Sequence, residues 1–286
     1  MSDIPVFFFH GLAYAALLFL VSSGLTLVFG MLNVINFAHA ALYMLGAYLS
    51  FTLLRWTGEF WLSLVVCPIA LFIIGALIER YLLRRVHVFG HVHELLLTFG
   101  LGFIITEGIK WIWGDFPHAV NLGGFLGQSV QMFGFTYPVY RLFVLLCALF
   151  VGLVMGVILY GTRLGVMLRA AVNDNSMVNA LGINVPLLFT GVFAFGAALS
   201  GFAGVIAGPL LTTYPGMAEE ILTDAFVVVV VGGFGSLGGA LIASLLIGQI
   251  LSFGVLLVPK LSLALVYLLM SVVLVLRPSG LFGEKE

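Results

Sequence analysis

The chain has 286 residues, of which 62% are hydrophobic and only 8% are charged; its formal net charge is −1 and its mean hydropathy is +1.23. Soluble domains carry about 25% charged residues, so this composition excludes a water-soluble fold, a disordered chain and a nucleic-acid-binding protein. We therefore expect an all-α, polytopic membrane protein in contact with lipid, with residues 1–286 forming one transmembrane domain.

Apolar runs separated by polar or turn residues predict the membrane-spanning helices, because a span needs about 20 apolar residues. In chain order the predicted spans are 6–30, 40–55, 60–82, 95–113, 139–161, 187–211, 224–232, 240–258 and 261–277. The run at 224–232 is short and is interpreted as an inward limb. We therefore expect about eight to ten crossings in total.

Two of these regions are predicted to be interrupted helices, at 24–48 and 225–248. Each consists of an apolar limb, a break that contains Gly or Asn, and a second limb rich in small residues. Non-helical backbone at membrane depth must be buried or line a cavity, and paired interrupted helices point to the pathway of a transporter. The alternative is a tight turn between two full spans in each region.

Three polar residues of the first interrupted segment, Asn33, Asn36 and His39, are costly at membrane depth unless they are paired. They are expected to cap broken helix ends or to face a wet pathway, and capping is the preferred role for His39. We predict that these three and Phe226 lie nearer the pathway than the lipid.

Other polar groups permit two interpretations each. Glu107 and Lys110 are predicted to form an i,i+3 ion pair, with a proton relay as the alternative. The acidic residues Glu219, Glu220 and Asp224 form either a solvated rim or a contact with a docking protein. A short polar loop explains His87, His91, His93 and Glu94, although imidazole and carboxylate ligands also suit zinc.

Small residues recur along the span at 187–211 in a row that predicts close helix packing, within the chain or between chains. The row consists of Gly196, Ser200, Gly204 and Gly208, with Ala197 and Gly201 beside it. Pro209 is expected to end or kink this helix.

The longest polar stretch, residues 162–185, is predicted to fold as an arm that ends near Val172 and a short helix that Gly182 stops. Polar residues between Asn173 and Ser176 are the candidate caps of that short helix. So short a helix is not stable alone in water. We expect it to dock, either on the membrane interface as a connector or in the cleft of a partner as a lever.

Known catalytic and nucleotide-binding motifs are missing from the sequence. No Lys follows Gly, so there is no P-loop for ATP. The run Gly233-x-Gly235-x-x-Gly238 has the form of a dinucleotide fingerprint, but no acidic residue follows between Ala225 and Gly283 to bind the ribose. The sequence therefore predicts a transport protein with no catalytic residue, metal or cofactor of its own.

Several stretches in family order make the chain resemble the permease subunits of branched-chain amino acid ABC importers, the LivH/LivM type, and most of all the LivH-type subunit. They are Gly24 to Gly30 with Ile35 to His39, Leu42 to Tyr48, Arg163 to Gly165, Arg169 to Asn184, Phe226 to Gly239 and Leu276 to Gly283. There are two departures from the family pattern. Ala40 replaces a usual Gly and is expected to make the helix break less sharp, whereas Val178 replaces a usual Ala and is expected to alter the fit to the ATPase.

The resemblance implies an ATP-driven importer of the bacterial or archaeal cytoplasmic membrane, in which this chain pairs with a second permease, paralogous or identical. Two cytoplasmic ABC ATPases would hold ATP and Mg²⁺, and a periplasmic solute-binding protein would deliver the substrate. The residues expected to couple to the ATPase are Arg163, Arg169, Ala170, Asp174, Leu181 and Gly182. The residues expected along the translocation pathway are Asn33, Asn36, His39, Phe226, Gly233 and Gly235.

Branched-chain amino acids are the leading substrate, and related permeases suggest other amino acids, amides, urea or small organic acids. A stand-alone channel or ion-coupled carrier is the alternative function, and an intramembrane enzyme acting on lipid is a third.

The distribution of Lys and Arg predicts the orientation. If the loop at 80–94 is cytoplasmic, the inner basic residues are Arg80, Arg84, Arg85, Arg163, Arg169, Arg277 and Lys285. The outer ones are Arg55, Lys110, Arg141 and Lys260. This bias predicts an outside N-terminus and a cytoplasmic C-terminus.

Overall fold

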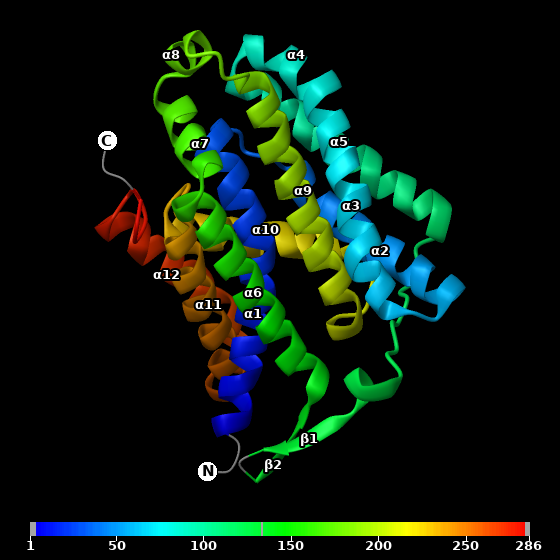
Figure 1. Cartoon of the computed structure of the whole chain (residues 1–286). Coiled ribbons are helices and arrows are strands. Elements are labelled where there is room, and N and C mark those ends of the chain that lie inside the picture. Colours follow the sequence, from blue (N-terminus) through cyan, green and yellow to red (C-terminus); the bar gives the residue numbers. More distant parts are fainter. Residues whose placement is uncertain (1–3, 133, 284–286) are drawn as a thin grey trace.

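The computed structural model describes residues 4–132 and 134–283, and it is a bundle of helices (Figure 1). Within this part of the chain, seven helical segments are long and apolar enough to cross a membrane. They contain α1 (Ile4–Leu32), α3 (Phe60–Ile78), α5 (His91–Trp113), α6 (Val139–Gly161), α9 (Val185–Leu210), α11 (Leu237–Leu257) and α12 (Ser262–Leu276). The predicted runs at 40–55 and 224–232 are the helices α2 (Ala38–Thr57) and α10 (Met217–Gly232). The expected all-α bundle is therefore confirmed.

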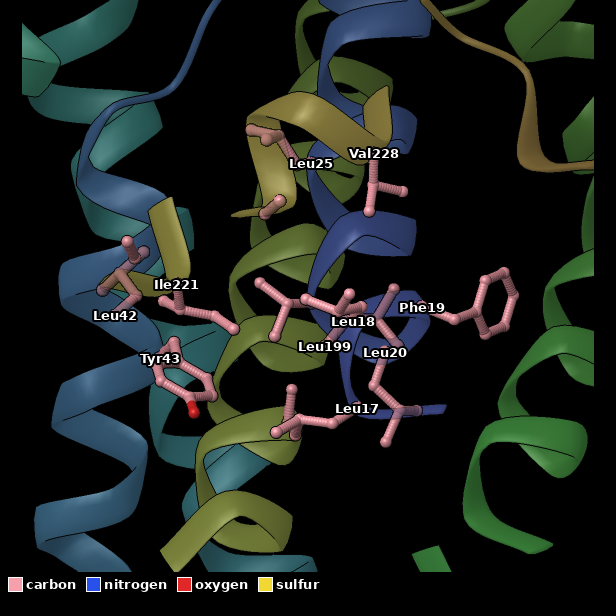
Figure 2. Close-up of a cluster of buried hydrophobic side chains, with 14 of the residues drawn as sticks. Leu17, Leu18, Phe19, Leu20, Leu25, Leu42, Tyr43, Leu199, Ile221 and Val228 are labelled. Carbon is pink, nitrogen blue, oxygen red and sulfur yellow. The ribbon is translucent and has the colours of Figure 1, made fainter. Parts of the chain in front are cut away.

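α1 lies at the centre of the bundle, where α6, α9, α10 and α11 pack around it. Its apolar residues cover the whole circumference, which is the pattern of a helix buried on all sides. Figure 2 shows Leu17, Leu18 and Leu20 of α1 in one cluster with Leu199 of α9 and Ile221 of α10. α10 itself runs across the bundle rather than along it (Figure 1).

The row of small residues on α9 packs against helices of the same chain. A Cβ atom on Gly204 would lie 2.9 Å from the backbone nitrogen of Ala47 in α2. Gly201 lies against Gly46 of α2 on one side and Leu71 of α3 on the other. Close backbone approach of this kind requires small residues, so the predicted packing is confirmed, and α9 ends one residue after Pro209.

α3 continues without a loop toward α5, whereas the sequence predicted a polar loop over 80–94. A π-helical turn (Glu79–Leu83) is followed by α4 (Arg84–Val86) and a 3₁₀ turn (His87–Phe89). Gly90, at φ 93°, then starts the reversal into α5. The predicted loop was wrong because the helical backbone extends past the apolar core, where Arg80 and Arg85 are exposed, while Glu94 is buried in the first turn of α5.

The extended segment between α5 and α6 contains a feature that the sequence did not predict. The strands β1 (Ser129–Met132) and β2 (Phe135–Pro138) form an antiparallel hairpin. The Tyr137 hydroxyl donates to the carbonyl oxygen of Phe9 at 2.8 Å, which joins the hairpin to the start of α1.

The basic residues separate to the two ends of the bundle. One end, the arginine end, carries α4, α7 (Arg163–Asn173) and α8 (Asn175–Ala180), and the hairpin and the start of α1 lie at the opposite end (Figure 1). The helix bounds place Arg80, Arg84, Arg85, Arg163, Arg169 and Arg277 at the arginine end. They place Arg55, Lys110, Arg141 and Lys260 toward the other end. Lys285 lies outside the described residues, and the side of the membrane that each end faces stays a prediction.

Candidate functional site

The first interrupted segment folds back into the bundle. α1 ends at Leu32, and Asn33 adopts a left-handed conformation at φ 53°, from which its N–H donates to the carbonyl oxygen of Phe29 at 2.8 Å. Asn is one of the few residues that adopt the left-handed conformation, and a residue in this conformation commonly ends a helix. α2 then starts beside the middle of α1, because Nε2 of His39 lies 2.9 Å from the carbonyl oxygen of Val21. Since Val21 precedes Leu32 by about 16 Å of helix, the chain runs back into the bundle between the end of α1 and the start of α2.

Thr98 of α5 satisfies the backbone of this break. Its hydroxyl accepts from the N–H of Phe37 at 3.3 Å and lies 3.3 Å from the carbonyl oxygen of Ile35, to which it can donate. Buried backbone groups away from water need such partners. The sequence analysis missed Thr98, because a single Thr in an apolar run gives no periodic signal.

The second interrupted segment depends on glycines and on the C-terminal residues. Between α10 and α11, Gly233 and Gly235 have φ values of 99° and 77°, which favour glycine. The N–H groups of Leu281 and Phe282 donate to the carbonyl oxygens of Val231 and Gly232 at 2.9 and 3.0 Å. The segment after α12 therefore completes the last turn of α10, a role that the sequence did not suggest.

The two breaks meet at the arginine end. A Cβ atom on Gly30 would lie 2.6 Å from Cα of Gly235, and the ring centroids of Phe29 and Phe234 are 4.4 Å apart. Both breaks also line one cavity of about 730 Å³, to which α7 contributes Arg169. This cavity connects the interrupted helices with residues 162–185, the polar stretch that is the predicted coupling segment.

The short helix of the coupling segment begins and ends at the residues that the sequence predicts. Asp174 caps α8, because its Oδ1 accepts from the N–H of Met177 at 2.9 Å, and Gly182 ends the turn that follows at φ 85°. Val178 is buried with Ala171 and Val185 and fastens α8 to its own chain. The Val178 departure therefore acts inside the segment rather than on its outer surface.

The six residues predicted to couple to an ATPase are all exposed at the arginine end. Leu181 is the most telling, because an apolar side chain that is 72% exposed stands at the tip of the segment. Arg169 donates to the carbonyl oxygen of Leu159, and its guanidinium lies 5.9 Å from the centroid of the Tyr160 ring. These contacts join α7 to the end of α6.

The residues predicted along the pathway have different environments. Asn36 and His39 are buried, while Asn33 is exposed at the arginine end and Phe226 is 37% exposed on α10. The capping role preferred for His39 is wrong, because its ring bonds the backbone of α1 and not an end of α2. Gly233 is buried beneath the C-terminal segment and Gly235 borders the cavity between the breaks. That these residues face a translocation pathway stays a prediction.

A polar clamp that the sequence did not predict joins the π-helical turn and α4 to α9. Arg84 Nη2 lies 3.0 Å from a carboxylate oxygen of the buried Glu79, and it donates to the carbonyl oxygen of Pro186 at 2.9 Å. The hydroxyl of Thr190 also donates to Glu79. Because Pro186 directly follows the coupling segment, the clamp fixes the point at which that segment enters α9.

The remaining polar candidates form local pairs. Glu94 pairs with His87 and with His91, but among the described residues no three His, Cys, Asp or Glu side chains are arranged so that they could hold one metal ion. Nζ of Lys110 lies 2.7 Å from Oε1 of Glu107, so the predicted ion pair is confirmed. The prediction of a solvated acidic rim is right for Glu219 and Glu220, which are exposed. It is wrong for Asp224, which is half-buried and accepts from the hydroxyl of Tyr14 at 2.6 Å.

Comparisons with known proteins point in one direction. Residues 7–275 match the family described as "Branched-chain amino acid transport system / permease component". The chain is 28% identical to the branched-chain amino acid transport permease BraD of Pseudomonas aeruginosa, over 97% of this chain and 95% of that protein. It is also 28% identical to LivH of Escherichia coli with the same coverage, and 27% identical to a probable LivH of Methanocaldococcus jannaschii over 82% and 76%. No solved structure matches the chain.

Proposed function

Because the chain belongs to the permease-component family of branched-chain amino acid transport systems, we propose that it is the membrane-spanning subunit of an ATP-driven importer. Its substrate is a branched-chain amino acid, the class that its relatives BraD and LivH are named for transporting. In this proposal the arginine end faces the cytoplasm, as the positive-inside rule favours, and the N-terminus lies outside.

The observation that supports this proposal most strongly is the α7–α8 segment. It presents exposed polar and apolar side chains at the arginine end, in a chain whose sequence has no P-loop. A transporter that uses ATP without binding it needs such a contact with a separate motor. Two ATPases would receive the segments of two permeases, and a periplasmic binding protein would deliver the amino acid at the opposite end.

Proteoliposomes test the proposal. The full chain is reconstituted with a second permease and enclosed ATPases, and uptake of labelled L-leucine is measured with the binding protein outside. Uptake is expected only when ATP and both ATPases are inside. Leucine movement by the chain alone, without ATP, would contradict the proposal and favour the channel or carrier.

A further inference from the structure

A second cavity lies between α2, α5 and α10, away from the arginine end. Its volume is about 240 Å³, which is smaller than the roughly 300 Å³ at which pockets for drug-sized ligands begin. It therefore suits a small molecule. Phe37, at the end of the first break, forms part of its wall, so the cavity borders the interrupted segment directly.

One wall of this cavity is apolar, and Phe99 and Phe103 in it are 48% and 53% exposed. The ring centroids of Phe37 and Phe99 are 6.1 Å apart, those of Phe99 and Phe103 are 4.9 Å apart, and both pairs meet edge to face. Ala40 and Ala41 line the α2 side with small side chains. An aromatic wall opposite small residues leaves space for a short aliphatic group and favours its removal from water.

Charged groups lie at one end of the same cavity. Glu107 and Lys110 follow Phe103 along α5, and Glu219 comes from the first turn of α10. Lys110 keeps 36% of its side-chain surface exposed and Glu107 keeps 64%, so both are accessible to a ligand in water. An ammonium group and two carboxylates beside an apolar wall match a molecule that carries both charges on a small head and has an apolar tail.

We infer that this cavity is a binding site within the permease for a zwitterionic α-amino acid with a short branched side chain. The α-carboxylate binds Lys110, the α-ammonium binds Glu107 and Glu219, and the side chain packs against Phe37, Phe99 and Phe103. The inference rests on the proposed function and gives its substrate a place in the membrane. Phosphatidylethanolamine carries an ammonium group and an anionic group too, so the test must separate a lipid from a free amino acid.

Two leucine substitutions on α5 form a matched pair for the test. The Cβ atom of Gly102→Leu would meet the backbone of Phe37 and Ala38 at 3.6 Å or more, which is ordinary contact, so that side chain fits and occupies the cavity. Gly100→Leu is the control, because nothing lies within 4 Å of its Cβ position and Gly100 does not line the cavity. Lys110→Gln removes the cation, and Lys260→Gln removes an exposed one elsewhere.

Binding of labelled L-leucine to the full chain is measured in phosphatidylcholine nanodiscs, and the KM for ATP-driven uptake is measured in the reconstituted complex. We expect Gly102→Leu and Lys110→Gln to raise the Kd for leucine and the KM for uptake by about tenfold or more. In both controls the two constants are expected to stay within about twofold of wild type. 4-Methylpentanoate and isoamylamine, which each lack one charge, are expected to bind more weakly than leucine.

Wild-type binding and KM in both Gly102→Leu and Lys110→Gln would overturn this site. In a second set of nanodiscs that also contain phosphatidylethanolamine, occupation of the cavity by this lipid that leucine cannot displace would overturn it too. If the wild-type complex takes up leucine with ATP and the two cavity variants bind and transport leucine as the wild type does, the site is wrong and the proposed function stands. If the wild-type complex shows no ATP-driven uptake, the proposed function itself fails.

Discussion

Gly30 of α1 packs so closely on Gly235 that a Cβ atom on Gly30 would lie 2.6 Å from the Cα atom of Gly235. The first residue belongs to the interrupted segment in the first half of the chain and the second to the interrupted segment in the second half. Their contact joins the two breaks, and the cavity of about 730 Å³ that both line opens beside α7. Under the proposed function, we expect a movement of the coupling segment to reach both breaks at once.

Gly30→Ala should separate the two breaks. The added carbon meets backbone, which cannot rotate away, so we expect a cost of about 1–3 kcal/mol in stability and a loss of most ATP-driven uptake. Thermal unfolding in detergent and uptake in proteoliposomes measure the two effects. Gly238→Ala is the control, because nothing lies within 4 Å of its Cβ position; an equal loss in both variants would show that the contact itself is unimportant.

Asp174 gives a way to separate the cap of α8 from the charge. Asp174→Asn keeps an oxygen that accepts from the N–H of Met177, whereas Asp174→Ala removes it and costs the helix about 1 kcal/mol. If α8 must be folded to engage a motor, ATP-driven uptake falls strongly in Asp174→Ala and little in Asp174→Asn. Arg85→Ala, an exposed cation at the same end, should transport normally. Equal loss in both Asp174 variants would assign the effect to the carboxylate charge instead.

Leu281→Pro should release the end of α10. Proline has no N–H, so the donation to the carbonyl oxygen of Val231 disappears, whereas Leu281→Ala retains it. We expect the proline variant to have a lower unfolding temperature than the alanine variant and a lower uptake rate. Identical behaviour of the two variants would mean that this backbone bond does not stabilise the break.

Thr98→Val tests the support of the first break. The substitution removes the hydroxyl that accepts from the N–H of Phe37 and can donate to Ile35 or Leu95, and a buried group left without a partner costs about 1–3 kcal/mol. Thermal unfolding should therefore fall clearly below wild type. Thr57→Val, whose exposed hydroxyl reaches only the carbonyl oxygen of Leu53 and the N–H of Glu59, should be close to neutral.

The sequence predicted the helices well, because the apolar runs in a membrane protein must be long and continuous. It also predicted where the short helix of the coupling segment begins and ends, since Asp174 and Gly182 act through local backbone geometry. It gave two interpretations of the breaks, and the contact between His39 and Val21 shows that α2 starts beside the middle of α1.

The parts that the sequence could not supply depend on contacts between distant residues. Thr98 lies 61 positions after Phe37, and Thr190 lies 111 positions after Glu79. The C-terminal residues Leu281 and Phe282 find their partners only once α12 has returned beside α10. None of these pairs leaves a periodic signal, because each consists of one polar group on an apolar helix or one backbone group in a turn.

The most direct test of the account asks what the α7–α8 segment touches in the assembled transporter. A photo-reactive amino acid at Leu181, which is 72% exposed, is illuminated in native membranes and the linked protein is identified by mass spectrometry; Leu187, 67% exposed beside an apolar cavity, is the control. We predict that position 181 captures an ABC ATPase and position 187 does not. If position 181 captures only lipid or no protein at all, this chain does not receive its energy through the segment and the account is wrong.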